Sequence, residues 1–262
     1  MNGKTNFHTH SVYCDGKDTL EELVEQALAM GMENLGFSGH SYTYFDESYC
    51  MSLKDTRDYQ KEVLALKEKY RDKIKLYLGI EQDFYSEEST AGYEYVIASV
   101  HYVKKCGEYL SIDESAEDLK RYAEDFYHGD IYGLIEDYFQ TVALLAQSKW
   151  SIIGHFDLIC KFQEQTPLFD ENHPRYQKAA QIALAELLKA GKIIEINTGA
   201  MARGYRTLPY PAEKWLDLAA ENKGRLLLSS DCHDKNYLTY GFDLPLMAKY
   251  EVFIIKNPFK QQ

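Results

Sequence analysis

The sequence is poor in the features that mark secreted and membrane proteins. Its 262 residues include only five cysteines, an odd number with no Cys-x-x-Cys pair: Cys14, Cys50, Cys106, Cys160 and Cys232. This count disfavours a disulfide framework and fits a reducing compartment. No apolar run approaches the roughly 20 residues that a membrane span needs, and the first residues lack the apolar segment of a signal peptide. We therefore expect a soluble, cytoplasmic protein.

Positive charge is also scarce. Forty-one Asp and Glu residues face 29 Lys and Arg residues, which gives a formal net charge of −12. Nucleic acids and anionic membranes bind to positive potential, so neither is an expected partner. A small anionic substrate is not excluded, because a local cationic site can override the net field of the protein. The sequence leaves both a monomer and a homodimer open.

Short apolar runs alternate with longer amphipathic stretches along the chain. Seven runs are predicted to be buried strands: Lys4–His8, Asn34–Ser38, Lys75–Ile80, Tyr95–Val100, Trp150–Gly154, Lys192–Asn197 and Arg225–Ser229. Helices are predicted at Thr19–Met30, Leu53–Arg71, Ala116–Gln147 with a break near Gly129, Pro174–Ala190 and Pro211–Glu221. This alternation predicts an α/β protein with a parallel sheet, closed or open, in one domain over residues 1–262.

Two segments do not follow the alternation. Tyr102–Gly133 is polar and rich in Tyr and Glu, and we interpret it as an excursion from the sheet. Tyr250–Gln262 contains Val-Phe-Ile-Ile, which predicts a terminal strand followed by a frayed tail.

The histidines are concentrated where predicted strands end. Six of the eight lie there, accompanied by three acids, and the nine residues are His8, His10, Asp15, His40, Glu81, His101, His155, Asp231 and His233. In an α/β barrel, residues beyond the carboxyl ends of the strands converge on one face. A lone histidine after a strand is usually structural, but the joint pattern is difficult to explain that way. Imidazole and carboxylate groups suit Zn²⁺, Mn²⁺ and Fe²⁺, and nine ligands favour two or three bridged ions.

These residues stand in motifs that resemble the polymerase-and-histidinol-phosphatase (PHP) superfamily. The motifs are Phe7-His8-Thr9-His10-Ser11, Asp15-Gly16, Gly39-His40-Ser41, Glu81, Ser99-Val100-His101, Gly154-His155-Phe156-Asp157 and Ser230-Asp231-Cys232-His233. They agree with that superfamily in type, order and position at strand ends, over most of the chain. The segment from Glu195 to Ala200 resembles the sixth-strand motif of its histidinol-phosphate phosphatase branch.

The resemblance implies a fold and a metal site. The fold is a distorted (βα)7 TIM-like barrel with the metals at the C-terminal ends of the strands. The implied ligands of three divalent ions (zinc, manganese or iron) are His8, His10, Glu81 and Asp231 for the first, Glu81, His101 and His155 for the second, and Asp15, His40 and His233 for the third. Many members of the superfamily have histidine where this chain has Asp15.

The resemblance also implies an activity. We expect a phosphomonoesterase of histidine biosynthesis that hydrolyses L-histidinol phosphate through attack of a metal-bound hydroxide on phosphorus. Arg203, Arg206 and Lys161 are the expected phosphate contacts, because arginine and lysine bind phosphate oxygens. Asp231 or His233 is expected to protonate the leaving group. The amine and imidazole of the substrate are expected to contact acidic and aromatic side chains. Candidates for these contacts are Tyr42, its loop Ser41–Ser52 and Asp83.

Three other functions compete with this one. The first is a PHP phosphoesterase that acts on phosphotyrosine, a nucleotide or another small phosphate monoester. The second is a structural or regulatory barrel that has lost its ligands, which the presence of all nine expected ligands disfavours. The third is a metal-dependent amidohydrolase, where a carbamylated lysine commonly bridges the ions; Glu81 favours the phosphoesterase. Cys14 and Cys232 stand beside expected ligands and are predicted to be packing residues.

Overall fold

The computed structural model describes residues 4–259. All seven predicted strands are present and form one sheet in which every neighbouring pair is parallel. In sheet order they are β1 (Lys4–Asn6), β2 (Met32–Phe37), β3 (Lys75–Asp83), β4 (Tyr95–Ser99), β7 (Ile152–Ile153), β8 (Ile193–Asn197) and β9 (Arg225–Ser229). The order of the strands in the sheet is their order in the chain, as expected for a singly wound barrel.

The two edges of the sheet meet just beyond its last residues. The backbone N–H of His10 donates to the carbonyl of Cys232 at 2.8 Å, and the N–H of Cys232 donates to the carbonyl of His8 at 3.0 Å. Thr9 and Cys232 form a parallel bridge there. The sheet therefore closes at its carboxyl end, which confirms the prediction of a distorted seven-stranded barrel.

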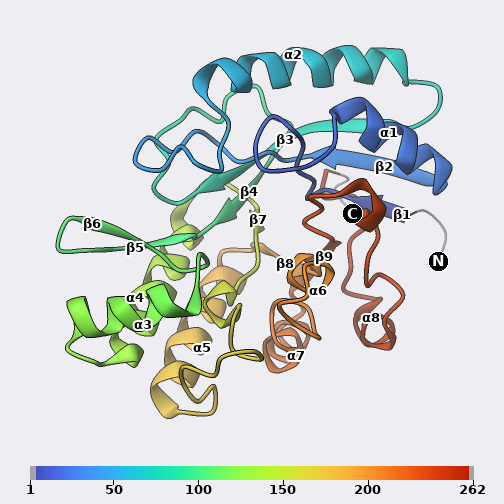
Figure 1. The fold of residues 1–262 in the computed structure, drawn as a ribbon. Helices are drawn as coiled ribbons and strands as arrows, with labels where there is room; N and C mark the ends of the chain where they lie inside the picture. Colours follow the sequence, from blue (N-terminus) through green and yellow to red (C-terminus); the bar gives the residue numbers. More distant parts are fainter. Residues whose placement is uncertain (1–3, 260–262) are drawn as a thin grey trace.

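Helices surround the sheet, as Figure 1 shows, with α1 (Leu20–Ala29) and α2 (Leu53–Lys69) along one side. Along the other side lie α3 (Ala116–Tyr127), α4 (Ile131–Leu144), α5 (Pro174–Lys189) and α7 (Glu213–Glu221). The predicted break near Gly129 is present, because His128 and Gly129 both have positive φ and end α3. Within residues 4–259, no helix is long and apolar enough to span a membrane.

Several elements were not predicted. The excursion contains an antiparallel hairpin of β5 (Tyr102–Lys105) and β6 (Glu108–Ser111). Two short helices, α6 (Gly199–Ala202) and α8 (Pro245–Tyr250), and single 3-10 turns at Leu158–Cys160 and Lys235–Tyr237 also escaped prediction. They were missed because three to six residues carry too little periodicity to distinguish a helix from a loop. The end of the predicted helical range, Leu145–Gln147, is a 3-10 turn.

The predicted terminal strand was wrong over the described residues. Helix α8 ends at Tyr250, and only Ile254 makes a bridge, to Leu226. The ring of Phe259 instead packs at 5.6 Å from Phe7 and 4.8 Å from Tyr77, between ring centroids. The tail thus packs against the amino end of the barrel through Phe259, which stays 37% exposed, without pairing as a strand. The last residues of the predicted range, 260–262, lie outside the described part.

The barrel interior changes from apolar to polar along the strands. Side chains of a strand alternate between two faces, and every second residue of these strands points into the barrel. The inward-facing residues include Tyr77, Gly79 and Glu81 on β3, Tyr95, Ile97 and Ser99 on β4, Ile193, Glu195 and Asn197 on β8, and Leu227 and Ser229 on β9. Tyr77, Tyr95, Ile97, Ile193 and Leu227 share one buried cluster with Phe7. The interior therefore has an apolar floor below a polar layer at the carboxyl ends of the strands, where the predicted ligands lie.

Candidate metal centre

The carboxylate of Glu81 is the centre of the histidine cluster. Glu81 ends the inward-facing row of β3 and is 1% exposed. Its oxygens lie within 3.5 Å of a nitrogen of five imidazoles: His8 (3.1 Å), His10 (3.4 Å), His40 (3.0 Å), His101 (3.5 Å) and His155 (3.0 Å). Burial opposes ionisation of Glu81, but the charges of His8 and His40 hold its pKa well below the ordinary value. The carboxylate is thus ionised and shared by several possible ligands.

Unsatisfied polar atoms at this point fit a cation. His8 Nε2, His10 Nε2 and Glu81 Oε2 are buried and make no hydrogen bond. Possible ligand atoms of these three residues lie within 4.8 Å of one another. Buried polar atoms in proteins normally have a partner, and imidazole nitrogen and carboxylate oxygen are common ligands of divalent transition metals. The donor set therefore suits a divalent ion.

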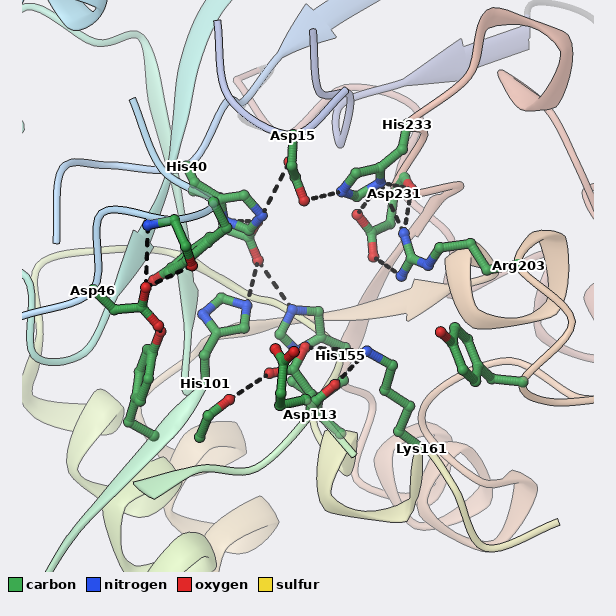
Figure 2. Close-up of a pocket in the computed structure, with 18 residues that line it drawn as sticks. Asp15, His40, Asp46, His101, Asp113, His155, Lys161, Arg203, Asp231 and His233 are labelled. Carbon is green, nitrogen blue, oxygen red and sulfur yellow. Dashed lines mark hydrogen bonds and ion pairs between the residues drawn. The ribbon is translucent and has the colours of Figure 1, made fainter. Parts of the chain in front are cut away.

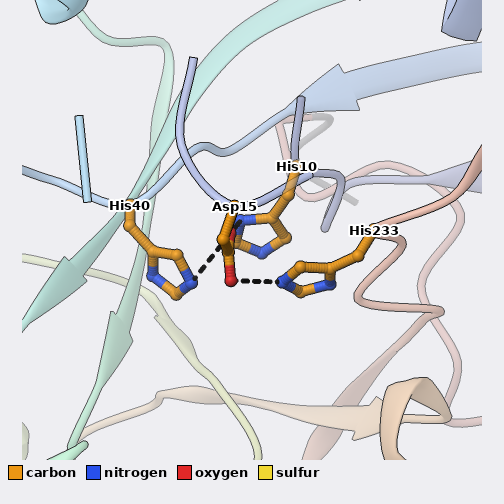
Figure 3. A group of neighbouring side chains, drawn as sticks. All are labelled: His10, Asp15, His40 and His233. Carbon is orange, nitrogen blue, oxygen red and sulfur yellow. Dashed lines mark hydrogen bonds and ion pairs between the residues drawn. The ribbon is translucent and has the colours of Figure 1, made fainter. Parts of the chain in front are cut away.

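A second group of possible ligands surrounds Asp15, as Figure 3 shows. Its carboxylate lies 3.1 Å from His233 Nε2, 3.6 Å from His10 Nδ1 and 3.7 Å from His40 Nε2. Burial raises the pKa of Asp15, but His40 and His233 outweigh this and hold it well below the usual range. Gly16 permits the loop to fold back, because a Cβ there would lie 2.5 Å from the backbone of His10.

A third group joins Glu81 to His40 and His101. The structure thus brings all nine predicted residues into one cluster. His40 lies between two groups, since one ring nitrogen faces Glu81 and the other faces Asp15. His155 is in none of the three groups, although its Nε2 lies 3.0 Å from Glu81. The assignment of each ligand to a particular ion stays a prediction.

Asp231 reaches the cluster through an unusual backbone conformation. Its φ is +46°, a region that non-glycine residues rarely adopt and that occurs often at functional sites. The carboxylate lies 3.2 Å from His10 Nε2 and accepts a hydrogen bond of 3.1 Å from Arg203 Nη2. Gly199 leaves room for this side chain, because a Cβ at residue 199 would lie 2.7 Å from it.

The cluster forms the floor of a cavity of about 310 Å³, shown in Figure 2. Arg203 and Lys161, two of the predicted phosphate contacts, line it. Arg203 Nη1 lies 2.8 Å from His233 Nδ1, and Lys161 Nζ donates to the carbonyl of Asp113 at 2.6 Å. Two cationic side chains therefore face the same space as the metal-ligand cluster.

Two predicted substrate contacts do not line this cavity, namely Arg206 and Tyr42. Arg206 is 8% exposed, and its Nη1 donates to the carbonyl of Cys160 at 3.0 Å while the guanidinium lies over the ring of Tyr210. The hydroxyl of Tyr42 donates to Glu47 at 2.9 Å. Both groups are held by other partners, so we withdraw them as substrate contacts.

Other residues of the cavity wall were missed. Tyr102, Asp113 and Glu114 line it, together with Asp46 and Tyr49 from the predicted loop 41–52. Their approach depends on how the β5–β6 hairpin lies against loop 41–52, where Tyr102 donates to Asp46 Oδ2 at 2.8 Å. The only sequence signal was the richness of the excursion in Tyr and Glu.

The two cysteines beside the ligands differ in their contacts. The thiol of Cys232 donates to the carbonyl of Asp234 at 3.0 Å, away from the cavity. The sulfur of Cys14 lies 3.5 Å from His10 Nδ1, a contact that the sequence did not reveal. Burial raises the pKa of Cys14 to about 12, so it is a neutral thiol and not a thiolate ligand.

Comparison with known proteins finds one matching family and several similar proteins. The family model described as the PHP domain matches residues 6–199. A Schizosaccharomyces pombe protein named "probable histidinol-phosphatase" is 28% identical over 261 residues, covering 90% of this chain and 83% of its own. A solved structure from Listeria monocytogenes, named as a candidate histidinol phosphatase, matches with a TM-score of 0.77 and 23% identity, covering 91% of this chain and 98% of its own.

A second solved structure is a Lactococcus lactis histidinol phosphate phosphatase in complex with zinc, L-histidinol and phosphate. It matches with a TM-score of 0.66 and 19% identity, over 88% of this chain and 87% of its own. At these identities the two solved structures establish the barrel fold.

Proposed function

Because this chain belongs to the PHP domain family, we propose that it is a metal-dependent phosphatase that hydrolyses L-histidinol phosphate to L-histidinol and phosphate. The observation that carries the proposal is the cavity itself, in which a metal-ligand cluster, two cationic side chains and several acids face one space. Relatives that match this chain over most of their length bear the histidinol-phosphatase name, which supports the choice of substrate.

Three divalent ions are proposed, with zinc as the first candidate because the Lactococcus lactis enzyme contains it. His8, His10, Glu81 and Asp231 would hold one, Glu81, His101 and His155 the second, and Asp15, His40 and His233 the third. Such ions supply a nucleophile from water at neutral pH and neutralise charge on phosphoryl oxygens. The nine side chains would hold the ions at the floor of the cavity, on the same space that Arg203 and Lys161 line.

The cavity offers different chemistry to the two ends of the substrate. Arg203 and Lys161 are the proposed phosphate contacts, since they present N–H donors beside the metal cluster. Asp46 and Glu114 are acids of the wall, and Figure 2 shows Asp46 on the side opposite Arg203. Asp113 lies on the cationic side, because its Oδ2 is 3.4 Å from Lys161 Nζ. Within residues 4–259, the carboxylate of Glu114 has no hydrogen-bond or ion-pair partner. A substrate with an anionic end and a cationic end matches this division.

The leaving alkoxide needs a proton, for which Asp231 and His233 are the candidates. Burial opposes ionisation of Asp231, but the charges of Arg203 and His8 hold its pKa well below the usual range. An ionised carboxylate has no proton to donate. His233 is no better supplied, because its Nδ1 accepts from Arg203 Nη1 at 2.8 Å and its Nε2 is the nitrogen left for an ion, so Asp231 and His233 stand as equal candidates.

The test of the proposed function is a comparison of substrates with purified, metal-loaded protein. We expect kcat/KM for L-histidinol phosphate to exceed that for p-nitrophenyl phosphate and phosphotyrosine by at least about tenfold, because p-nitrophenyl phosphate has no amine for the acids of the wall and phosphotyrosine brings a carboxylate that they repel. Equal rates for all three would reject histidinol phosphate as the preferred substrate and favour another small phosphate monoester.

Arg203→Lys is expected to raise the inhibition constant of inorganic phosphate about tenfold. Lysine keeps the charge but loses the planar fork that binds two phosphate oxygens at once, and one such hydrogen bond is worth about 1.5 kcal/mol or more. Arg206→Lys is the matched control, because Arg206 does not line the cavity. An unchanged constant in the first variant, or an equal rise in the control, would remove Arg203 from the phosphate site.

A further inference from the structure

A buried carboxylate outside the proposed ligand set lies directly behind the metal cluster. Glu195 of β8 is 0% exposed and points into the barrel below Glu81. One of its oxygens lies 2.6 Å from His8 Nδ1 and also accepts a hydrogen bond from Ser229. The other accepts from the backbone N–H of His155 at 2.8 Å and from Asn197 at 2.9 Å. Both oxygens are therefore fully engaged.

Asp83 occupies an equivalent place at the end of β3. The sequence suggested it for the substrate amine, but it is 2% exposed and does not line the cavity. Its Oδ2 accepts a hydrogen bond of 2.9 Å from the backbone N–H of His101 and lies 3.3 Å from His101 Nδ1. Its Oδ1 accepts from the N–H of Tyr85 at 2.8 Å. Asp83 thus holds both the backbone and the ring of one predicted ligand.

The two carboxylates meet their imidazoles in the same way. In His8 and in His101, Nδ1 faces the carboxylate behind the cluster and Nε2 faces Glu81, at 3.1 Å and 3.5 Å. A carboxylate at Nδ1 keeps the ring proton there, which leaves the lone pair of Nε2 directed at the centre of the cluster. It also makes the ring a stronger base and fixes its rotation.

We infer that Glu195 and Asp83 are positioning residues of the metal centre, and that each holds proposed ligands from behind the cluster. Asp83 orients His101 alone. Glu195 orients His8 through its side chain and His155 through its backbone, so it supports the ligands of two ions at once. This inference rests on the proposed metal site, and it adds two residues to the nine that the motifs mark.

Burial of two extra charges makes a purely structural role a poor explanation. Removing a carboxylate from water costs several kcal/mol unless good partners compensate it. An apolar side chain would fill the same space in the barrel without that cost. Retention of both charges is explained when their partners are imidazoles that must present one nitrogen to a cation.

The test uses Glu195→Gln and Asp83→Asn in the full-length chain, with Asp157→Asn as the matched control. Asp157 is also 0% exposed and accepts a backbone N–H, from Ala212 at 2.9 Å, but it contacts no imidazole of the described cluster. Zinc affinity is measured by competition with a chromophoric chelator, without substrate. Unfolding temperatures are measured for the metal-free and zinc-loaded forms.

Asp83→Asn is expected to lower the affinity for one zinc ion by about 10–100-fold, and Glu195→Gln to lower the affinity for two zinc ions by a similar factor. The gain in unfolding temperature on zinc loading should shrink in both variants, while the control keeps wild-type affinities. Unchanged zinc affinity in both variants would overturn the inference, as would an equal loss in Asp157→Asn. A protein that passes this test but does not hydrolyse L-histidinol phosphate would refute the proposed substrate and leave the positioning role intact.

Discussion

Replacing Glu81 by alanine is expected to abolish the phosphatase activity, with kcat/KM falling about a thousandfold or more, which corresponds to roughly 4 kcal/mol of transition-state stabilisation. The physical reason is that one carboxylate faces nitrogens of five imidazoles and is proposed to bridge two ions. Its loss removes a ligand from both ions and leaves the histidines without their shared counter-charge. The measurement is steady-state kinetics with metal content determined on the same sample.

Glu81→Gln is the control for the change of side-chain size in Glu81→Ala. Glutamine keeps the size of the side chain but carries no charge, so it should lose nearly as much activity while it perturbs packing less. Both variants should retain the far-ultraviolet circular dichroism of the wild type, since Glu81 lies above the apolar floor of the barrel. More than a few per cent of residual activity, with unchanged metal content, would contradict the bridging assignment.

Removal of the metal ions is expected to abolish activity and to lower the unfolding temperature by at least about 5–10 °C. Each ion that binds only the folded chain stabilises it by mass action, by about 2.7 kcal/mol when it is present at 100 times its dissociation constant, and 1 kcal/mol shifts the midpoint of a chain of this size by about 2–4 °C, so one ion alone accounts for this shift. In addition, three buried ligand atoms, His8 Nε2, His10 Nε2 and Glu81 Oε2, make no hydrogen bond within residues 4–259.

The measurement compares protein dialysed against a chelator with the same protein after addition of zinc, manganese or iron. Activity and unfolding temperature should return together, and the ion that restores most activity identifies the preferred metal. Magnesium is the control, because it favours oxygen ligands and should restore little with a histidine-rich set. Full activity after verified loss of all three ions would reject the metal-dependent mechanism.

The strands and the ligand cluster were largely predictable from the sequence, for a physical reason, whereas closure of the sheet into a barrel was implied by the family resemblance. Buried parallel strands are short apolar runs, and a residue that follows one must lie at the carboxyl end of the sheet. Polar residues such as Glu81 and His155 could therefore be placed near each other although helices and loops separate their strands. The alternation of side chains along β3 also fixes that Glu81 points inward above Tyr77 and Gly79.

The cavity wall was not predictable in the same way. Arg203 and Arg206 are of one residue type and three positions apart, but only Arg203 lines the cavity. The short helix α6 and the carbonyl of Cys160, which accepts from Arg206, decide between them. Asp83 was predicted for the substrate and instead contacts His101. Such assignments depend on loop conformation, which periodicity does not encode.

The sequence by itself determined the order of the strands along the chain, the nine metal-ligand candidates and the negative net charge, because these follow from apolar periodicity and residue type. Only the tertiary structure decided which acids and cations face the cavity, how the tail packs against the barrel floor, and that Glu195 and Asp83 stand behind His8 and His101. Those features arise from contacts between residues far apart in the chain, such as the 187 positions that separate His8 from Glu195, and their geometry exists only once the barrel has closed.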